Sequence, residues 1–498
     1  MAGNNTNTAQ NTTTGATDLT VTFIGGTATL LLPILFFMGA TVYLFIGAGA
    51  FDLTALALVG FGMLIFGSLL AKTPAHYWKA AVGGMASEMA ATVTLLLLAA
   101  GVFSAMMKAG GLTAAITTLG TSLGLSASAF TLFVLLASAL MATATGSSIG
   151  TILTAMPVFF PAGVALGADP ALVAGAIMSG AIFGDNLAPV SDVTIISALT
   201  QHHADGSTAE VADVVRSRLP YALIALLLAA PAYLFLGTTT APTAAVAATA
   251  LQGASLKGLL MLVPVAVLIA VALKTRDILR AITAGLIVGV PLGLVAGLFT
   301  PEAVFTVKNG QPAGFLYAGL NNMAGIVLLC LTLFAYTGVV GKANVEGLLT
   351  RLTTKKGDQT RAPLSPRGFE CLQGALTLAT TVLFAGVTSA SCALVGSLTD
   401  RLGTECGVEA ARRSHLLSGF ANSLPVLFPF SAFILITLAV AKSDALTVAL
   451  TPFTLLQGAF YPMALFVVFA VSVATGIGRR PMKKTVAVQA APVVTTVA

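Results

Sequence analysis

The chain has 498 residues, of which 57% are hydrophobic and only 8% are charged. Soluble proteins carry about a quarter of charged residues, so this composition indicates a polytopic membrane protein and excludes an ordinary soluble enzyme. The net charge of +6 gives no support to nucleic-acid binding, because the basic residues cluster in short loops between apolar runs. The first 28 residues are rich in Asn and Thr and contain no Lys or Arg, so we expect a disordered polar tail over 1–28.

Apolar runs between residues 29 and 475 predict an all-α fold with about 10–14 membrane segments, several of them shorter than a straight crossing requires. The runs 128–143 and 148–166 are joined by a linker that is small and polar. Such a linker is unsuited to lipid, so a re-entrant hairpin or a broken helix is predicted there.

Basic residues orient the loops. The 341–370 loop and the C-terminal tail, 477–498, are rich in Lys and Arg, so both are predicted to be cytoplasmic. Residues 372–399 lie between two basic loops and should therefore enter and leave the membrane from the same side, as a hairpin does.

An internal repeat follows from matched motifs. The 145–148 segment resembles 388–391, the Ser-Gly pair at 179–180 recurs at 418–419, and Pro-x-Ser occurs at both 189–191 and 429–431. The loop charges give the two halves opposite orientations, so we expect a first transmembrane repeat over 29–240 and an inverted second one over 241–476. Two inverted repeats with broken helices in corresponding positions indicate a secondary transporter.

The stretch from Ser179 to Thr194 carries two carboxylates inside a run of about membrane-spanning length. A carboxylate at bilayer depth costs roughly 2.5–3.5 kcal/mol, so such a residue calls for a functional explanation. Gly184 and Pro189 predict that one helix stops near the first and that the next restarts at the second. A broken helix with carboxylates at the break is typical of a cation site in a transporter.

Asp192 is the leading candidate for binding the cation and the proton, with Ser191 and Thr194 as neighbouring oxygens. The alternative is that Asp192 only complements the positive end of a helix dipole, worth about 0.3–1 kcal/mol. Burial disfavours the charged form of a carboxylate, so such a group can hold a proton near neutral pH and exchange it for Na⁺.

Asp185 and Asn186 are predicted to lie at the end of the first half-helix, where cations are favoured. A helix-end cap that faces a water-filled vestibule is an equal alternative. Asn422 and Ser423 occupy the matching position in the second half without a carboxylate, so the two halves are expected to differ chemically.

Two hydroxyl-rich hairpin tips are expected to border the substrate cavity. Their candidate residues, together with the Ser of the second Pro-x-Ser motif, are Thr145, Ser147, Ser148, Thr388, Ser389, Ser391 and Ser431. Taken singly, such residues more often bond to helix carbonyls or join helices. The Gly-x-x-x-Gly spacings at 146–150 and 180–184 are further candidates for docking the first hairpin on the broken helix.

Glu88 lies near the cytoplasmic start of the 88–107 run. Extension of its side chain to water is the simpler explanation, and a place on a proton path is the alternative. Nucleotide-binding loops and hydrolase motifs are absent from the sequence, which favours a transporter over an enzyme. We expect no cofactor beyond the transported Na⁺ and H⁺, with Asp192 and Asp185 as ligands of the transported metal ion.

The motifs Thr145-Gly-Ser-Ser-Ile-Gly-Thr151, Ser179-Gly-Ala-Ile-Phe-Gly-Asp185 and Pro189-Val-Ser-Asp-Val-Thr194 resemble those of the NhaC family of Na⁺/H⁺ antiporters, within the ion-transporter superfamily. The resemblance implies cation/proton exchange at the carboxylates and hydroxyls of these motifs. The chain departs from the family pattern at three positions in 186–193: Asn186 stands where Lys is common, Ala188 replaces the usual Ser and Val193 replaces a Thr.

The leading hypothesis is a proton-coupled Na⁺ or Li⁺ antiporter of the bacterial inner membrane that works by alternating access. The alternative is an organic acid or amino acid exchanger on the same fold, and a passive channel or membrane scaffold is a third possibility. The apparent lack of Lys or Arg deep in any span favours an inorganic cation. The expected partners are the lipid bilayer and the transported solute, with a possible homodimer and no nucleic acid.

Overall fold

We describe the protein from a computed structural model, which covers residues 20–48, 52–124, 126–236, 256–345, 347, 364–443 and 450–479. Several sequence predictions fall on residues outside this part of the chain. They are most of the polar N-terminal tail, nearly all of the 238–257 boundary between the repeats, most basic residues of the 341–370 loop, and the tail from 480 onward.

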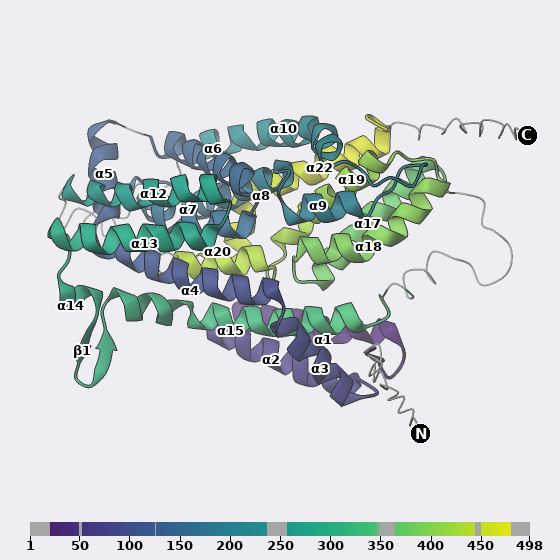
Figure 1. Cartoon of the computed structure of the whole chain (residues 1–498), viewed down its shortest axis with the longest axis horizontal. Helices are drawn as coiled ribbons and strands as arrows, with labels where there is room; N and C mark the ends of the chain where they lie inside the picture. Colours follow the sequence, from purple (N-terminus) through teal and green to yellow (C-terminus); the bar gives the residue numbers. More distant parts are fainter. Residues whose placement is uncertain are drawn as a thin grey trace, which may run out of the picture.

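Apart from one small hairpin of two antiparallel strands, the regular elements are helical (Figure 1). In chain order they are η1 (Thr27–Leu30), α1 (Leu31–Val42), η2 (Tyr43–Gly47), α2 (Leu53–Leu70), α3 (Pro74–Met85), α4 (Glu88–Ala109), α5 (Leu112–Ser122), α6 (Ala127–Thr145), α7 (Ser148–Ala165), α8 (Pro170–Leu187), α9 (Asp192–Leu199), α10 (Val211–Leu236), η3 (Leu256–Met261), α12 (Leu262–Thr275), α13 (Ile278–Val295), α14 (Pro301–Val304), β1 (Thr306–Lys308), β2 (Gln311–Ala313), α15 (Phe315–Lys342), α17 (Pro366–Leu383), α18 (Thr388–Glu405), α19 (Ala410–Ala421), η4 (Leu424–Leu427), α20 (Ala432–Ser443), α21 (Pro452–Gly458) and α22 (Phe460–Thr475).

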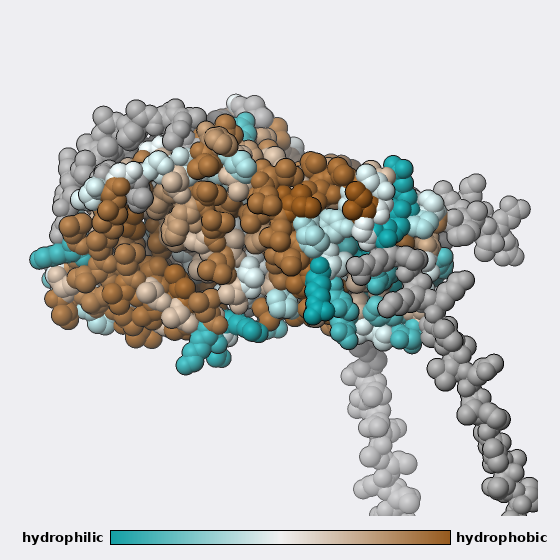
Figure 2. All heavy atoms as spheres, turned by 90° about the horizontal axis from the view of Figure 1, so that it is seen from above, coloured by the Kyte–Doolittle hydropathy of each residue, from teal (hydrophilic) through white to brown (hydrophobic). Residues whose placement is uncertain are grey.

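Within the described residues, nine helices are long and apolar enough to cross a membrane. Two further bent helix pairs, α19–η4 with α20 and α21 with α22, raise the number of spans to as many as eleven. Figure 2 shows apolar side chains over most of the visible face, while hydrophilic ones gather toward the right-hand end. The prediction of an all-α polytopic membrane protein is confirmed, at the low end of the expected 10–14 segments. Helices α17 and α18 are not among these spans, which is one reason why their number lies at the low end of the predicted range.

The two halves contain the same series of elements. In the first half, a long helix (α4) precedes a helical hairpin (α6 and α7), a broken helix (α8 and α9) and a further long helix (α10). The second half repeats this order with α15, the hairpin of α17 and α18, the broken pair of α19 and α20, and α22. Figure 1 shows α17 and α18 at the right-hand end, whereas α5, which leads into α6, lies at the left-hand end. The hairpins therefore enter from opposite ends, as inverted repeats require.

The first hairpin docks on the broken helix through glycines. A Cβ on Gly180 would lie 2.3 Å from the carbonyl oxygen of Leu135, and one on Gly184 would lie 2.4 Å from the backbone nitrogen of Thr143. Both partners belong to α6, so its backbone rests directly on that of α8. Close approach through small residues is the usual means of packing helices in membranes. The docking role predicted for the 180–184 spacing is confirmed.

The break in the first half lies later than the sequence predicted. Helix α8 continues through Gly184 to Leu187, and α9 begins at Asp192 rather than at Pro189. The reason is that Gly184 serves close packing against α6 rather than helix termination, and its carbonyl still accepts a hydrogen bond from the amide of Ala188. The unwound segment is therefore confined to 188–191.

Candidate functional site

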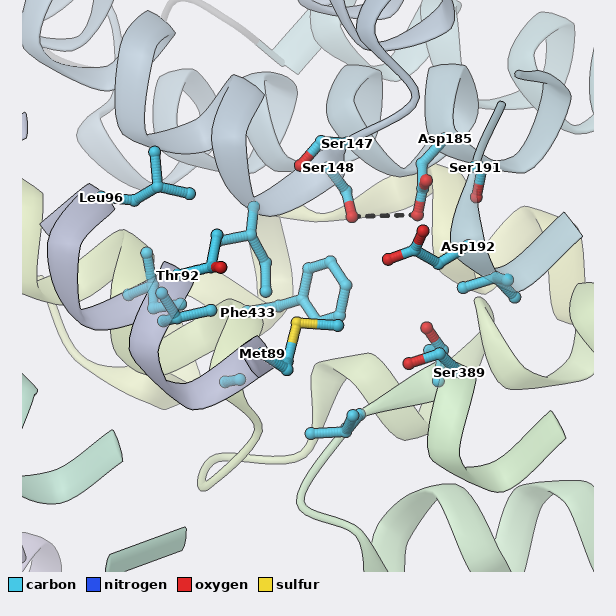
Figure 3. Close-up of a pocket in the computed structure, with 18 of the residues that line it drawn as sticks. Met89, Thr92, Leu96, Ser147, Ser148, Asp185, Ser191, Asp192, Ser389 and Phe433 are labelled. Carbon is cyan, nitrogen blue, oxygen red and sulfur yellow. Dashed lines mark hydrogen bonds between the residues drawn. The ribbon is translucent and has the colours of Figure 1, made fainter. Parts of the chain in front are cut away.

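A cavity of about 170 Å³ lies where the two hairpin tips and the first helix break meet (Figure 3). Its walls come from α4, α7, α8, α9, α15, α18 and α20, so both halves of the chain contribute. The lining residues are Met89, Thr92, Val93, Leu96, Gly146, Ser147, Ser148, Ile149, Asp185, Ser191, Asp192, Val193, Cys330, Phe334, Gly386, Val387, Thr388, Ser389, Ala432, Phe433 and Ile436.

Asp185 is the buried carboxylate of this cavity, with only 5% of its surface exposed. It lies in the last turn of α8, as the sequence predicted, and the Ser148 hydroxyl donates a 3.0 Å hydrogen bond to its Oδ2 atom. Ser148 is the first residue of α7, so this bond joins the tip of the first hairpin to the end of the broken helix. A carboxylate in such a position binds a proton or a cation more readily than it stays charged alone.

Asp192 lies next to Asp185 but in a different environment. It is the first residue of α9, Ser191 precedes it at the N-cap position, and its side chain is exposed and points toward the cavity (Figure 3). The sequence-based inference that Asp192 is buried is therefore wrong. The reason is that the later break places Asp192 at the open start of α9, whereas the packed end of α8 encloses Asp185.

Arg218 was missed by the sequence analysis. It lies within α10, is fully buried, and its Nη1 atom donates to the backbone oxygen of Asn186 and, at 3.1 Å, to the Thr194 hydroxyl. The inference that no Lys or Arg lies deep in a span is therefore wrong. The spacing of Val214, Arg218 and Tyr221 is the signal that could have revealed it, because these residues share one face of α10, and that face is buried.

The hydrogen bonds of Arg218 connect the two sides of the helix break. Asn186 belongs to the last turn of α8 and Thr194 to the first turn of α9, so the guanidinium group ties the two half-helices together. Two of its donors, Nε and Nη2, have no hydrogen-bond partner within the described part of the chain. Asn186 also donates to the Tyr461 hydroxyl at 3.3 Å, and neither Asn186 nor Thr194 lines the cavity.

The predicted hairpin-tip residues divide into two groups. Ser147, Ser148, Thr388 and Ser389 line the cavity, so the structure brings both tips to one site. The remaining predicted residues do not line it, and most bond to nearby groups. The Thr145 hydroxyl donates to Met141, Ser391 bonds to Thr377 and Thr380, Ser423 donates to Phe420, and Ser431 donates to Val426. Asn422 is fully buried, and its side-chain atoms have no partner among the described residues.

The structure pairs the residues of the two hairpin tips differently from the sequence comparison. Thr145 ends α6, whereas Thr388 begins α18, so the structural counterpart of Thr388 is Ser148. The shift arises because the second tip turns earlier, through Ala385 and Gly386, which both have positive φ angles. The first tip turns at Gly146, whose φ is 70° and where a Cβ would lie 2.6 Å from Val190.

Glu88 is exposed at the start of α4 and is not among the cavity residues, although Met89 and Thr92 on the same helix are. Its position favours the simpler explanation, a side chain that reaches toward water. Within the described residues, no group of three or more His, Cys, Asp or Glu side chains could hold a resident metal ion. The cavity does contain two carboxylates, Asp185 and Asp192, beside serine hydroxyls.

Ion pairs at the start of α19, one of them buried and one partly buried, join this helix to α17 and α18. Arg412 of α19 donates to Glu370 of α17 at 3.0 Å, and Glu370 also accepts a 2.7 Å bond from Arg479. Next to it, Arg413 pairs with Asp400 at 2.8 Å, and that carboxylate also contacts the His202 ring at 2.8 Å. Arg412 and Arg413 are both buried residues of α19, which begins at Ala410, and the sequence analysis selected neither.

The fold and the site together define a class. Two opposed hairpins and a broken helix converge on a cavity that carries carboxylates, inside a helical body that can cross the membrane repeatedly. This is the architecture of a secondary transporter, whose substrate site lies where inverted repeats meet.

Comparison with known proteins shows which family the first part of the chain resembles. Residues 2–238 match the sequence model described as "Na+/H+ antiporter family". Residues 2–238 are thus similar to the Na⁺/H⁺ antiporter family, and the resemblance of the chain to NhaC proteins is confirmed.

Two characterised relatives show how far the similarity extends. The chain is 29% identical over 260 residues to a malate-2H⁺/Na⁺-lactate antiporter of Bacillus subtilis, a match that covers 50% of this chain and 53% of the relative. It is 26% identical over 356 residues to the Na⁺/H⁺ antiporter NhaC of Alkalihalophilus pseudofirmus, covering 66% of this chain and 73% of the relative. The chain thus spans about half the length of the first relative and nearly three quarters of the second.

Solved structures give a weaker similarity. The YdaH transporter of Alcanivorax borkumensis aligns with 80% of this chain and 87% of its own, at a TM-score of 0.35 and 15% identity. MtrF of Neisseria gonorrhoeae aligns with 84% of this chain and 94% of its own, at a TM-score of 0.36 and 12% identity.

Proposed function

We propose that this protein is a proton-coupled Na⁺ antiporter in which Asp185 binds H⁺ and Na⁺ in turn. The observation that carries the proposal is the buried Asp185 carboxylate, bonded to Ser148 of one hairpin and facing a cavity that the other hairpin completes. The family of the first half supports the same function, as does the similarity to the NhaC antiporter.

Coupling follows from competition at one carboxylate. An ionised Asp185 without a counter-charge is costly in this buried position, so the empty site takes either a proton or a cation. Na⁺ is a hard cation that prefers oxygen ligands, and the Asp185 carboxylate and the Ser148 hydroxyl provide them. Because both ions need the same oxygen atoms, one must leave before the other binds, and the bound ion is the one carried across.

Asp192 has a separate role in this proposal. Its carboxylate is exposed at the cavity, where it attracts cations. It also borders the same cavity as Asp185 and lies beside it (Figure 3), and we assign it the role of an oxygen ligand of the bound cation. We therefore assign proton exchange to Asp185 and cation attraction to Asp192, the reverse of the emphasis in the sequence analysis.

Alternating access is supported by the placement of the hairpins. Ser148 and Ser389 border the same cavity, although their hairpins enter from opposite ends of the molecule. Movement of one hairpin would expose the cavity to one side while the other keeps it closed. We place the end that carries α17, α18 and Arg479 in the cytoplasm of a bacterial cell by the positive-inside rule, with the protein in the inner membrane.

Exchange of an organic acid, as the name of the malate/lactate relative describes for that protein, is the second candidate. The cavity argues against it, because Asp185 and Asp192 are the charged side chains among its described lining residues. Arg218 could pair with a carboxylate, but it lies behind the break and already binds Asn186 and Thr194. Two carboxyl groups without a cationic side chain in the described lining disfavour an organic anion and favour a cation.

A vesicle assay tests the proposal. Inside-out vesicles that contain the protein are acidified by respiration, and a pH-sensitive dye reports loss of the proton gradient when Na⁺, Li⁺, K⁺, malate or lactate is added. We expect Na⁺ or Li⁺ to collapse the gradient and the organic acids to leave it unchanged. A response to malate or lactate without a response to Na⁺ would contradict the proposal.

A further inference from the structure

We propose that the cavity also binds a small organic ammonium ion, with its charged nitrogen at Asp185 and Asp192 and its hydrocarbon part against the opposite wall. This inference rests on the proposed function in one respect, namely that the cavity is the transport site. It goes beyond that function because it adds a class of substrate, alkylammonium ions, that inorganic cation exchange does not require.

The cavity has two chemically distinct sides. Figure 3 shows the carboxylates of Asp185 and Asp192 on one side, with Met89, Leu96 and Phe433 across from them. The second side is apolar and comes from three helices and the second tip. Its residues are Met89, Val93 and Leu96 of α4, Cys330 and Phe334 of α15, Ala432, Phe433 and Ile436 of α20, and Val387.

This apolar wall gives no advantage to an inorganic cation. Na⁺ needs oxygen ligands around it, and side chains such as Leu96 or Phe433 cannot supply them. A hydrocarbon chain instead gains about fourfold in affinity for each methylene group moved from water onto such a surface. The wall is also distinct from ordinary core packing, because these side chains border an open volume beside two carboxylates rather than one another alone.

The volume of the cavity and the charge of its side chains also fit an alkylammonium ion. A volume of about 170 Å³ exceeds what one bare ion occupies, since a single water position requires only about 10–15 Å³. The remaining space has room for a chain of a few carbon atoms. The two carboxylates select a positive head group, and the described lining residues include no Lys, Arg or His that would bind a substrate carboxylate. The structure thus favours an amine over an amino acid or an organic acid.

Calorimetry at constant pH measures the binding of small amines and acids to the purified full-length protein and so tests this inference. A binding assay is chosen because neutral amines cross membranes unaided and would disturb a vesicle assay. The probes form a matched set. Methylammonium and n-butylammonium differ in chain length, norvaline adds a carboxylate to the butylammonium skeleton, and pentanoate carries only the negative charge. Na⁺ is titrated separately, and then in competition with n-butylammonium.

We expect n-butylammonium to bind at least about tenfold more tightly than methylammonium, because of its three additional methylene groups, and to compete with Na⁺. Norvaline and pentanoate should bind more weakly than n-butylammonium. Equal affinity for the two ammonium ions, binding of Na⁺ that n-butylammonium does not displace, or tighter binding of norvaline would overturn the inference.

Variants distinguish the contribution of the apolar wall to binding from that of the carboxylates. Phe433→Ala should weaken n-butylammonium binding about fivefold or more while changing Na⁺ affinity less than about twofold, because it removes only apolar contact. Phe430→Ala is the matched control, a buried phenylalanine of the same region that does not line the cavity. If Phe433→Ala fails to fold, Leu96→Ala removes apolar surface from the same wall. Equal effects of Phe433→Ala and Phe430→Ala would overturn the assignment.

The two proposals fail in different ways. Binding of Na⁺ without binding of n-butylammonium refutes this inference and leaves Na⁺ antiport standing. Binding of n-butylammonium without any response to Na⁺ refutes the antiporter proposal and supports this inference. Binding of neither cation by folded protein refutes both.

Discussion

The hydrogen bond from Ser148 to Asp185 affects how tightly the proposed site holds a proton, and Ser148→Ala removes it. A hydrogen bond to a charged group contributes about 1.5–3 kcal/mol. Water in the cavity can replace part of the lost bond, so we take the lower value, about 1.5 kcal/mol. This corresponds to about one pH unit, at ~1.36 kcal/mol per unit.

The direction of the change follows from the donor. The Ser148 hydroxyl donates to the carboxylate and therefore favours the ionised form of Asp185 over the protonated form. Without this donor, Na⁺ must displace a more tightly held proton, so half-maximal exchange requires a pH about one unit more alkaline. Dye-based exchange in inside-out vesicles, repeated over a series of pH values at fixed Na⁺, measures this shift.

Ser68→Ala is a suitable control, because the Ser68 hydroxyl bonds at 2.8 Å to the Ile65 carbonyl of its own helix, away from the cavity. This variant should keep the wild-type pH profile. An unchanged or acid-shifted profile in well-expressed Ser148→Ala protein would refute the assignment of Asp185 as the carboxylate that exchanges its proton.

Three further predictions concern the surroundings of the site. Arg218→Gln should lower the melting temperature, because each buried acceptor that loses its donor costs about 1–3 kcal/mol, and an unchanged melting temperature would show that Arg218 does not hold the break. Gly184→Ala should lower stability by about 1–3 kcal/mol and reduce transport, because the new Cβ would meet the backbone of Thr143. Gly83→Ala, where nothing lies within 4 Å, is its control, and equal melting temperatures for the two variants would contradict the packing argument. Asp192→Asn should retain exchange but raise the half-saturating Na⁺ concentration about fivefold, since one exposed charge contributes about 1 kcal/mol. Complete loss of exchange in well-expressed Asp192→Asn protein would indicate that Asp192, rather than Asp185, is the carboxylate that exchanges its proton.

Much of the fold could be predicted because its signals are local. The glycines, prolines and hydroxyl residues at 145–151 and 179–194 mark a hairpin tip and a broken helix wherever they occur in an apolar run. Loop charges then indicated that the second hairpin is inverted relative to the first. The same local signals selected Asp185, Asp192, Ser148 and Ser389, and the structure brings all four to one cavity.

The remaining features depend on tertiary packing. The burial of Asp185 rather than Asp192 follows from how closely α6 packs on Gly184, which the Gly-x-x-x-Gly spacing suggests but does not quantify. Arg218 was missed because its buried surroundings come from the packing of α10 against the two half-helices. The apolar wall is contributed by α4, α15 and α20, helices whose sequences carry no sign that they meet at the site.

The central claim is that Na⁺ displaces a proton from Asp185, and proton release by purified protein tests it most directly. Na⁺ is added to the protein in weakly buffered detergent solution that contains a pH indicator, and Asp185→Asn and Asp192→Asn proteins are measured in parallel. We expect the wild-type protein to release protons on binding Na⁺, Asp185→Asn to release none, and Asp192→Asn to release them at higher Na⁺ concentration. Undiminished proton release from folded Asp185→Asn protein would contradict the account.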